Sequence, residues 1–282
     1  GRREVADRAL HIAVFVARAP YIRRLSWHIP CGFVAGKRKN VTACMMGCYV
    51  IMFEVLIYIL HGAATSPFVR KTWLFLKEKG LEFQHRQLDP LDKSERFLSM
   101  NPLGRIPVLE EADGNLISDS SVICDYLENV HPSPSLYPAD NRSRAQALWF
   151  EEYADTLLTQ ICAQVFWMHI IIPIRSGKPA DLTEIDAFCD KNYPGVFGYL
   201  ESVAPDDSSI VDNQFGIADI SLASTVRLLD LAGAPLDADR WPRFNDYYQR
   251  VISRPSAKSI IDEELFATEV FRTTGDAPQY QR

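Results

Sequence analysis

The stretch VLIYILHGAATSPFVRKTWLFLKEKGLEFQHRQL, residues 55–88, contains the pattern that decides the fold. Residues 55–60 are apolar and rich in β-branched side chains, which is typical of a buried strand. Residues 67–79 then show helical periodicity, and residues 83–88 follow as a plausible second strand. A strand, a helix and a strand in this order predict two parallel strands joined by a right-handed crossover.

The expected helix has clear signals at both ends. Ser66 is a good N-cap, Pro67 suits the first helical position, and Gly80 closes the far end. The apolar residues of one face are Val69, Trp73 and Leu76. Arg70 and Lys71 are expected on a solvated face. The open question is whether the Ser66 hydroxyl only caps the helix or also faces a ligand.

The remaining elements form a second group of strands and then helices. NPLGRIPVLE (101–110) and LIS (116–118) predict an antiparallel hairpin, and a helix is expected from Ser120 or Ser121. Residues 131–141 contain three prolines and are interpreted as a linker. Everything after the linker is predicted to be helical, so the fold class is a small α/β domain followed by an all-α domain.

Composition excludes some classes of protein. The chain has 282 residues, 47% hydrophobic and 23% charged, which allows two modest packed domains. Residues 1–51 carry a net charge of +7, so the other residues carry −13 of the overall −6. An acidic main body is not the electrostatic footprint of a nucleic-acid-binding protein.

Residues 1–51 are left as an unassigned basic extension. The segment 10–17 faintly resembles the apolar part of a signal peptide, and the arginine-rich start resembles a transit peptide. The favoured reading is an upstream artefact, because Met52 begins a clean strand pattern. A membrane-spanning helix over 41–60 is rejected, because Glu54 interrupts it and its second half suits a strand. The six cysteines form no CxxC or zinc pair, which favours reduced thiols in the cytoplasm.

Two further motifs could carry chemistry. Ile106-Pro107 at the start of a strand leaves a backbone edge open, and its peptide bond could be cis, although a trans proline in a turn is the simpler reading. Asp119 and Ser120 precede a helix, where backbone amides and the positive dipole end attract anions. Together they could hold an amino-acid head group that carries both charges, or they could simply cap the helix.

The order and spacing of SPFVRK, NPLGRIPVL and SDSSVICDYL resemble the glutathione transferase family. The resemblance covers about residues 53–265 and includes FGIADISLA (215–223) in the helical half. It implies a thioredoxin-like glutathione-binding domain at 52–130, the linker at 131–141, a helical substrate domain at 142–270 and a tail at 271–282. The TSPF context is most similar to tau-type and related bacterial enzymes of the serine type.

The resemblance also implies roles for single residues. Ser66 matches the serine that hydrogen-bonds the glutathione sulfur, and a cysteine-dependent thiol transferase is disfavoured because serine stands there. A zeta-like isomerase is also disfavoured, because the serine-rich loop of that group is absent. The other expected glutathione-binding residues are Arg105, Ile106, Pro107, Asp119 and Ser120. Two positions depart from the family pattern: Asp119 replaces the usual Glu, and Gly216 stands where a helix-capping Ser or Thr is usual. Asp219 is expected to reach back to the cap amide, and Phe215 to pack against Ile220.

Several other residues have open readings. His61 is expected to be structural rather than a base, and Cys124 to be a buried, inert thiol. Pocket lining and core packing stay open for five residues of the helical half: Trp149, Tyr153, Phe166, Trp167 and His169.

The expected function is a cytoplasmic, homodimeric detoxification enzyme that conjugates glutathione to hydrophobic electrophiles, with no metal, nucleic acid or membrane partner. The alternative is a non-catalytic binding or regulatory protein on the same fold.

Overall fold

The computed structural model describes residues 22–28, 41–46, 49–55, 58–89, 92 and 94–274. The signal-like segment 10–17, Cys31 and Cys48, and the tail from residue 275 lie outside the described residues. The chain divides into two compact units, one formed by residues 1–58 with 111–114 and the other by residues 59–110 with 115–282.

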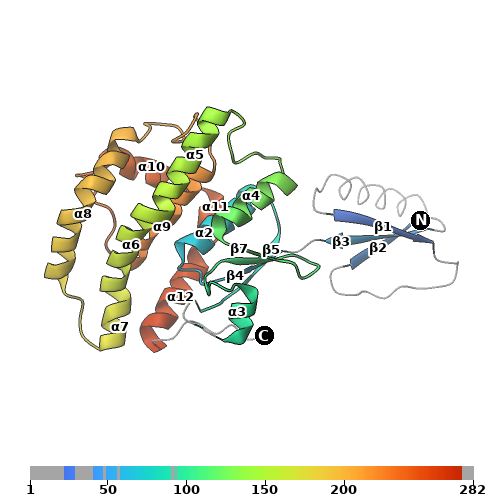
Figure 1. The fold of residues 1–282 in the computed structure, drawn as a ribbon, viewed down its shortest axis with the longest axis horizontal. Coiled ribbons are helices and arrows are strands. Elements are labelled where there is room, and N and C mark those ends of the chain that lie inside the picture. The colour runs from blue at the N-terminus through green and yellow to red at the C-terminus, as the bar shows by residue number, and fades with distance from the viewer. Residues whose placement is uncertain are drawn as a thin grey trace, which may run out of the picture. The chain divides into compact units, whose positions relative to one another are not determined.

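The described part of the first unit contains a small antiparallel sheet (Figure 1). Its strands are β1 (Ile22–His28), β2 (Val41–Met46) and β3 (Tyr49–Val55), in the order β1–β3–β2. The sequence predicted no element before residue 52, so these strands were missed. The apolar residues 41–60 belong to strands wherever they are described, in agreement with the rejection of a spanning helix.

Residues 58–118 contain a four-stranded sheet in the order β5–β4–β6–β7. Its strands are β4 (Tyr58–His61), β5 (Phe83–Arg86), β6 (Val108–Glu110) and β7 (Leu116–Ser118). β6 pairs antiparallel with both β4 and β7, which confirms the predicted hairpin. Of the strand predicted over 55–60, Val55 lies in β3 and residues 58–60 lie in β4, whereas residues 56 and 57 lie outside the described residues.

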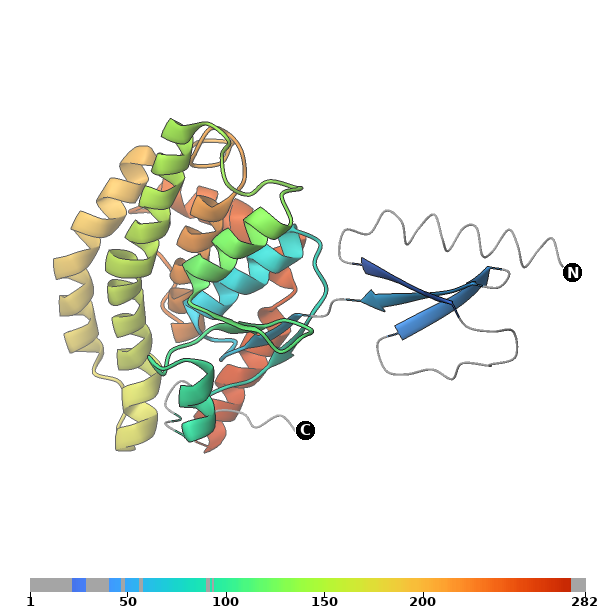
Figure 2. The same cartoon turned by 45° about the vertical axis from the view of Figure 1, so that its right-hand side comes forward.

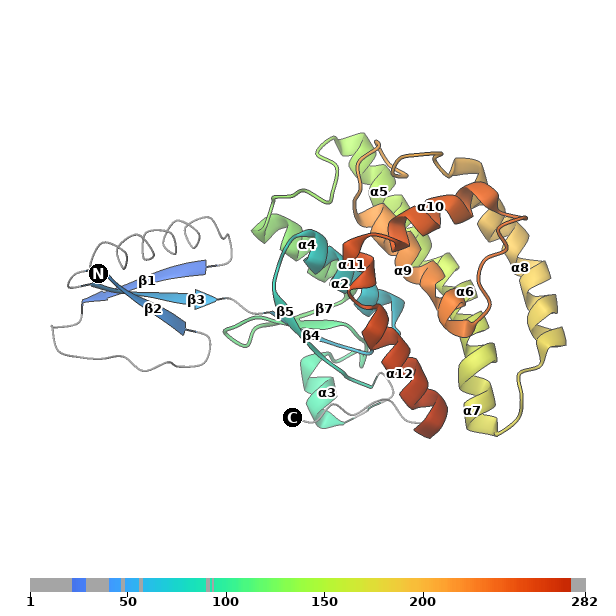
Figure 3. The ribbon, with the colours of Figure 1, turned by 180° about the vertical axis from the view of Figure 1, so that it is seen from behind.

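Helix α2 (Pro67–Glu78) forms as its signals predict. The Ser66 side chain accepts a hydrogen bond from the Val69 amide, and Gly80 adopts a left-handed conformation with φ of 67°. The prediction of a solvated face was wrong, because Arg70 and Lys71 are both buried. The reason is that α2 packs against α4 (Ser120–Val130) on one side and against α9 (Ile217–Ala232) on another, so it has no free face (Figures 1 and 3).

A short helix that the sequence did not predict lies between β5 and β6. This is α3 (Glu95–Met100), capped by Ser94, which accepts from the Phe97 amide. Phe97 is its one buried residue, so six residues with a single apolar anchor gave too little periodicity to recognise.

The helical half follows residues 131–140, which form neither helix nor strand. One continuous helical stretch runs from Asn141 to Ser176 and contains two π-helical turns. Its parts are α5 (Asn141–Tyr153), η1 (Ala154–Leu158), α6 (Thr159–Phe166), η2 (Trp167–Ile171) and α7 (Ile172–Ser176). The later helices are α8 (Leu182–Val203), α9, α10 (Pro242–Ile252), α11 (Pro255–Lys258) and α12 (Ile261–Thr274). The predicted combination of an α/β thioredoxin-like domain and an all-α domain is therefore confirmed (Figure 2).

Among the described residues, the stretch Asn141–Ser176 is the one helix long and apolar enough to cross a membrane, judged by length and composition alone. Core helices of soluble proteins meet the same criterion. Here α5 and α6 pack against α9, whose residues are mostly buried, so these two helices belong to the core of the helical domain.

Gly216, the cap of α9, has a packing reason for being glycine. A Cβ atom at this position would lie 2.4 Å from the carbonyl oxygen of Leu136, and that oxygen accepts from the Ile217 amide at 2.9 Å. Asp219 accepts from the Gly216 amide at 3.0 Å, as predicted. The close backbone approach of the linker to α9 therefore explains why no Ser or Thr stands there.

Candidate functional site

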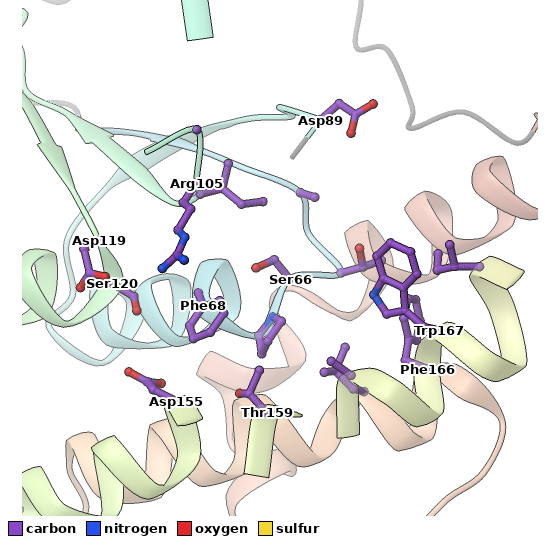
Figure 4. A pocket seen from close by; sticks show the side chains of 18 of the residues that line it. Ser66, Phe68, Asp89, Arg105, Asp119, Ser120, Asp155, Thr159, Phe166 and Trp167 are labelled. Carbon is purple, nitrogen blue, oxygen red and sulfur yellow. The ribbon is translucent and has the colours of Figure 1, made fainter. Parts of the chain in front are cut away.

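One cavity of about 1060 Å³ contains most of the residues that the sequence analysis selected. Ser66, Arg105, Ile106, Asp119 and Ser120 all line it. Figure 4 shows the Ser66 hydroxyl between two groups, with Arg105, Asp119 and Ser120 on one side and Phe166 and Trp167 on the other. Ligand pockets usually measure about 300–1,000 Å³, so this cavity is large enough for two small molecules.

Ser66 reaches the cavity because it ends a tightly held loop. The loop begins at Gly62, which has φ of 155°, and a Cβ atom there would meet the Val69 side chain at 2.3 Å. The Gly62 amide donates to Arg86 at 3.0 Å, and the Gly62 carbonyl accepts from His85 Nε2 at 2.8 Å. The loop is thus fixed to β5, and Ser66 stands at the positive end of α2.

Ile106 and Pro107 lie on the strand side of the same cavity. Their peptide bond is cis, so the simpler reading of a trans proline in a turn was wrong. Ile106 lines the cavity, whereas Pro107 is buried and is not among the lining residues.

A second helix begins at this cavity. Asp119 caps α4 by accepting from the amides of Ser121 at 2.9 Å and Val122 at 3.2 Å. Its φ of 81° is rare for a residue with a side chain, and strained backbone of this kind clusters at ligand-binding positions. Ser120 follows it and is buried. The capping reading of Asp119 is therefore correct, and the ligand-binding reading remains a prediction.

A charged cluster that the sequence did not predict borders the pair Asp119–Ser120. The ammonium of Lys71 donates to Ser121 Oγ at 2.9 Å, Glu151 Oε1 at 3.0 Å and Asp155 Oδ2 at 2.5 Å. Burial alone would lower the pKa of Lys71, but the two carboxylates outweigh it and raise that pKa, so the lysine stays charged. Ser121 and Asp155 line the cavity beside this cluster.

The other half of the cavity is mostly apolar. It is lined from the long helical stretch by Ala163, Phe166, Trp167, Ile170 and Ile171, with Leu228 and Ala267 opposite. The π-helical turns supply Asp155 and Thr156 from η1 and Trp167, Ile170 and Ile171 from η2. Such turns are frequent at functional sites because they redirect side chains within a helix.

Several open readings are now decided. Phe166 and Trp167 line the cavity, whereas Tyr153 is buried and donates to the Val196 carbonyl at 3.0 Å. His169 and Trp149 are not among the lining residues. Asp155, Thr159 and Arg175 also line the cavity and were not predicted, although the spacing of 152, 155, 156, 159 and 163 marks one helix face that could have identified the first two.

Two titratable residues near the site are structural. His61 Nε2 hydrogen-bonds Glu110 at 2.8 Å, and burial lowers the pKa of His61 despite that carboxylate. Burial raises the pKa of the Cys124 thiol, which is fully buried and therefore unreactive. Neither side chain lines the cavity. Among the described residues, no three His, Cys, Asp or Glu side chains are arranged to hold a metal ion.

Comparison with known families identifies both halves of the second unit. The family model "Glutathione S-transferase, N-terminal domain" matches residues 65–130, and "Glutathione S-transferase, C-terminal domain" matches residues 182–250.

Similar proteins include characterised and uncharacterised members. The GST-like protein YibF of Escherichia coli K12, named as uncharacterized, is 34% identical over 215 residues, which is 76% of this chain and 96% of YibF. Glutathione S-transferase omega-1 of Mus musculus is 36% identical over 87 residues, covering 31% of this chain but only 36% of the mouse protein. A glutathione S-transferase from Methylobacterium radiotolerans, solved with glutathione sulfonate, has 25% identity and a TM-score of 0.59, covering 80% of this chain and 96% of that one.

Proposed function

Because this chain belongs to the glutathione S-transferase family, we propose that it is a serine-type glutathione transferase acting on hydrophobic electrophiles. The observation that carries the proposal is the position of Ser66, at the start of α2 and between a polar and an apolar half of one cavity (Figure 4).

The polar half suits glutathione in both charge and shape. Arg105 offers a guanidinium for a carboxylate, and Asp119 with Ser120 offers an acceptor and a donor for the γ-glutamyl end. Ile106 presents a backbone edge beside a cis proline for the cysteinyl part. The complex of the Methylobacterium relative with glutathione sulfonate supports glutathione as the ligand.

The proposed chemistry requires only that the enzyme stabilise a thiolate. A free thiol has a pKa of about 8.5, and lowering it by two units requires about 2.7 kcal/mol. A charge-assisted hydrogen bond from Ser66 contributes roughly 1.5–3 kcal/mol, and the helix terminus adds about 0.3–1 kcal/mol. The thiol proton goes to solvent, sulfur bonds to the electrophilic carbon, and the leaving group departs with its bonding electrons.

The assembly and setting are also proposals. We place the enzyme in the cytoplasm as a detoxification enzyme, because the described cysteines Cys124, Cys162 and Cys189 are free and the reaction needs reduced glutathione. Helices α4 and α5 are joined by the Arg144–Asp125 ion pair at 3.0 Å. Both helices carry exposed apolar side chains, and these support a homodimer. These side chains are Val122, Val130, Leu148 and Trp149. Light scattering on purified protein tests the dimer.

The decisive experiment is a pH titration of the thiolate absorbance of bound glutathione, in the natural protein and in Ser66→Ala. We expect the thiol pKa to be lowered by a unit or more, and the substitution to restore it. Binding without any lowering would leave a non-catalytic binding protein, with Ser66 acting only as a cap. Failure to bind glutathione at all would refute the proposed function outright.

A further inference from the structure

The apolar half of the cavity contains one isolated positive charge. Of the described residues from 159 onward that line the cavity, Arg175 is the only one with a charged side chain. Its guanidinium lies over the indole of Trp167, with 5.6 Å between Cζ and the ring centroid. A flat cation is thus held against an aromatic wall of the site.

This charge is not neutralised within the described part of the chain, where no carboxylate forms an ion pair with Arg175. Arg240 provides a comparison, because its guanidinium also lies over an indole, 5.2 Å from the ring centroid of Trp241. Arg240, however, pairs with Asp190 at 3.6 Å and is not among the lining residues. Stacking alone therefore does not explain why Arg175 faces a ligand cavity.

Arg175 has a second local role, since it lies in the last turn of α7, where a cation stabilises the helix C-terminus. That role needs only the charge near the helix end, and within the described part of the chain the guanidinium donates no hydrogen bond. A guanidinium stacked on a ring keeps its in-plane N–H groups available, and these match a carboxylate with two parallel hydrogen bonds.

We propose that the Arg175–Trp167 pair binds the carboxylate of an aromatic electrophile, so that this enzyme prefers aryl carboxylate substrates. The inference rests on the proposed function, because it assigns the second substrate of the same cavity. The aromatic ring packs among Phe166, Ile170 and Ile171. The electrophilic carbon then faces the thiolate that Ser66 would hold, because the Ser66 hydroxyl lies between the polar half of the cavity and the pair Phe166 and Trp167 (Figure 4).

A matched pair of electrophiles tests the preference. With 4-chloro-3,5-dinitrobenzoate or neutral 2-chloro-1,3-dinitrobenzene, which differ only in the carboxylate, the carbon–sulfur bond forms as chloride leaves with its electron pair, and the thiol proton goes to solvent. Arg175→Gln should lower kcat/KM for the benzoate about tenfold and for the neutral compound about twofold, because one exposed charge-assisted pair is lost. Arg175→Lys should retain part of the preference, and Arg240→Gln should leave both values unchanged.

Binding provides a readout that does not need turnover. We expect 3,5-dinitrobenzoate to quench tryptophan fluorescence with an affinity that falls about tenfold in Arg175→Gln, whereas 1,3-dinitrobenzene should be almost unaffected. A further outcome is that the enzyme turns over neither chlorinated electrophile while Arg175→Gln still weakens the binding of 3,5-dinitrobenzoate and not that of 1,3-dinitrobenzene. In that case the proposed transferase function is wrong, but the carboxylate-binding site is supported.

Two results would overturn the inference. One is an equal response of both electrophiles and both dinitro compounds to Arg175→Gln. The other is a rise in KM for glutathione in this variant without any electrophile preference, which would assign Arg175 to a glutathione carboxylate instead.

Discussion

The ammonium of Lys71, on α2 of the thioredoxin-like domain, lies 3.0 Å from the carboxylate of Glu151 on α5 of the helical domain. Both side chains are buried, and Asp155 adds a second carboxylate to the same ammonium. This ionic cluster joins the two domains next to the candidate glutathione site.

We expect Lys71→Met to lower the free energy of unfolding by about 3–5 kcal/mol, because it leaves two carboxylates without their buried partner. Urea unfolding measures this loss. Lys77→Met is the matched control, because Lys77 lies on the same helix but is only partly buried, and it should cost less than about 1 kcal/mol. A loss for Lys71→Met as small as that of the control would show that the cluster contributes little to stability.

The cap and the ligand roles of Ser66 can be separated by comparison with Ser94. Each hydroxyl accepts from an amide three residues on, at 3.5 Å for Ser66 and 3.3 Å for Ser94. Ser66→Ala and Ser94→Ala should therefore each cost about 1 kcal/mol in urea unfolding. Only Ser66→Ala should change the thiol pKa of bound glutathione. A pKa change of the same size in Ser94→Ala would mean that both act through helix stability.

Gly216→Ala should destabilise the protein by about 1–3 kcal/mol, because the new Cβ would press against the Leu136 carbonyl. Gly195, in the exposed middle of α8, is the opposite case, since a Cβ there meets nothing within 4 Å. Gly195→Ala should stabilise by about 0.5–1 kcal/mol through helix propensity. Thermal unfolding of both variants tests whether the change in stability has opposite signs. No change in the stability of Gly216→Ala would mean that the linker at Leu136 shifts to make room for the Cβ atom at little cost.

Structural features that depend on residues close together in the sequence, such as helix ends, could be predicted. Ser66, Pro67 and Gly80 defined α2 correctly because capping involves residues within one turn. The burial of Lys71 and Arg70 was not predictable in this way, because their partners Glu151 and Glu264 lie 80 and 194 residues further along the chain. An arginine or lysine on a helix is normally solvated, and only the tertiary fold reverses that expectation.

The residues of the candidate site also divide into those that short sequence motifs predict and those that only the tertiary fold brings into the cavity. Ser66, Arg105, Asp119 and Ser120 could be selected because they occur in short motifs, and all four line the cavity. Arg175 occurs in no motif and reaches the cavity only because the helix from Asn141 continues through two π-helical turns. Each π-helical turn shifts the residues after it around the helix axis. A prediction that treats residues 141–176 as one regular α-helix therefore places Arg175 on the wrong face.

Stability should fall as the pH drops below the ordinary pKa of histidine, about 6.5. Burial lowers the pKa of His85, and the hydrogen bond to Gly62 opposes this only partly. The folded state then binds fewer protons than the unfolded state, so the free energy of unfolding decreases as pH falls from 6.5 toward the lowered value. Urea unfolding between about pH 8 and about pH 5 measures this decrease.

His85→Gln removes the titrating group, so the stability difference between the natural protein and this variant should shrink as the solution is acidified. His169→Gln is the comparison: burial lowers the pKa of His169 too, but that side chain is less enclosed, so its stability difference should shrink less. A difference for His85→Gln that stays constant across the pH range would contradict the prediction.

Helix α12 depends on one buried carboxylate. Glu264 is fully buried and pairs with Arg70 of α2 and, at 2.9 Å, with Arg227 of α9. Ala267 and Thr268, one turn further along α12, line the candidate cavity. Fixing this helix therefore also fixes one wall of the apolar half.

Glu264→Ala should cost about 3–5 kcal/mol in urea unfolding, because it leaves Arg70 buried without its carboxylate. Glu263→Ala, at the neighbouring position, is the control and should cost less than about 1 kcal/mol, because Glu263 is only partly buried. In Glu264→Ala the electrophile KM should rise more than the glutathione KM, since α12 lines the apolar half and not the polar one. Equal increases in both constants would mean that the loss of Glu264 disturbs the whole cavity rather than this wall.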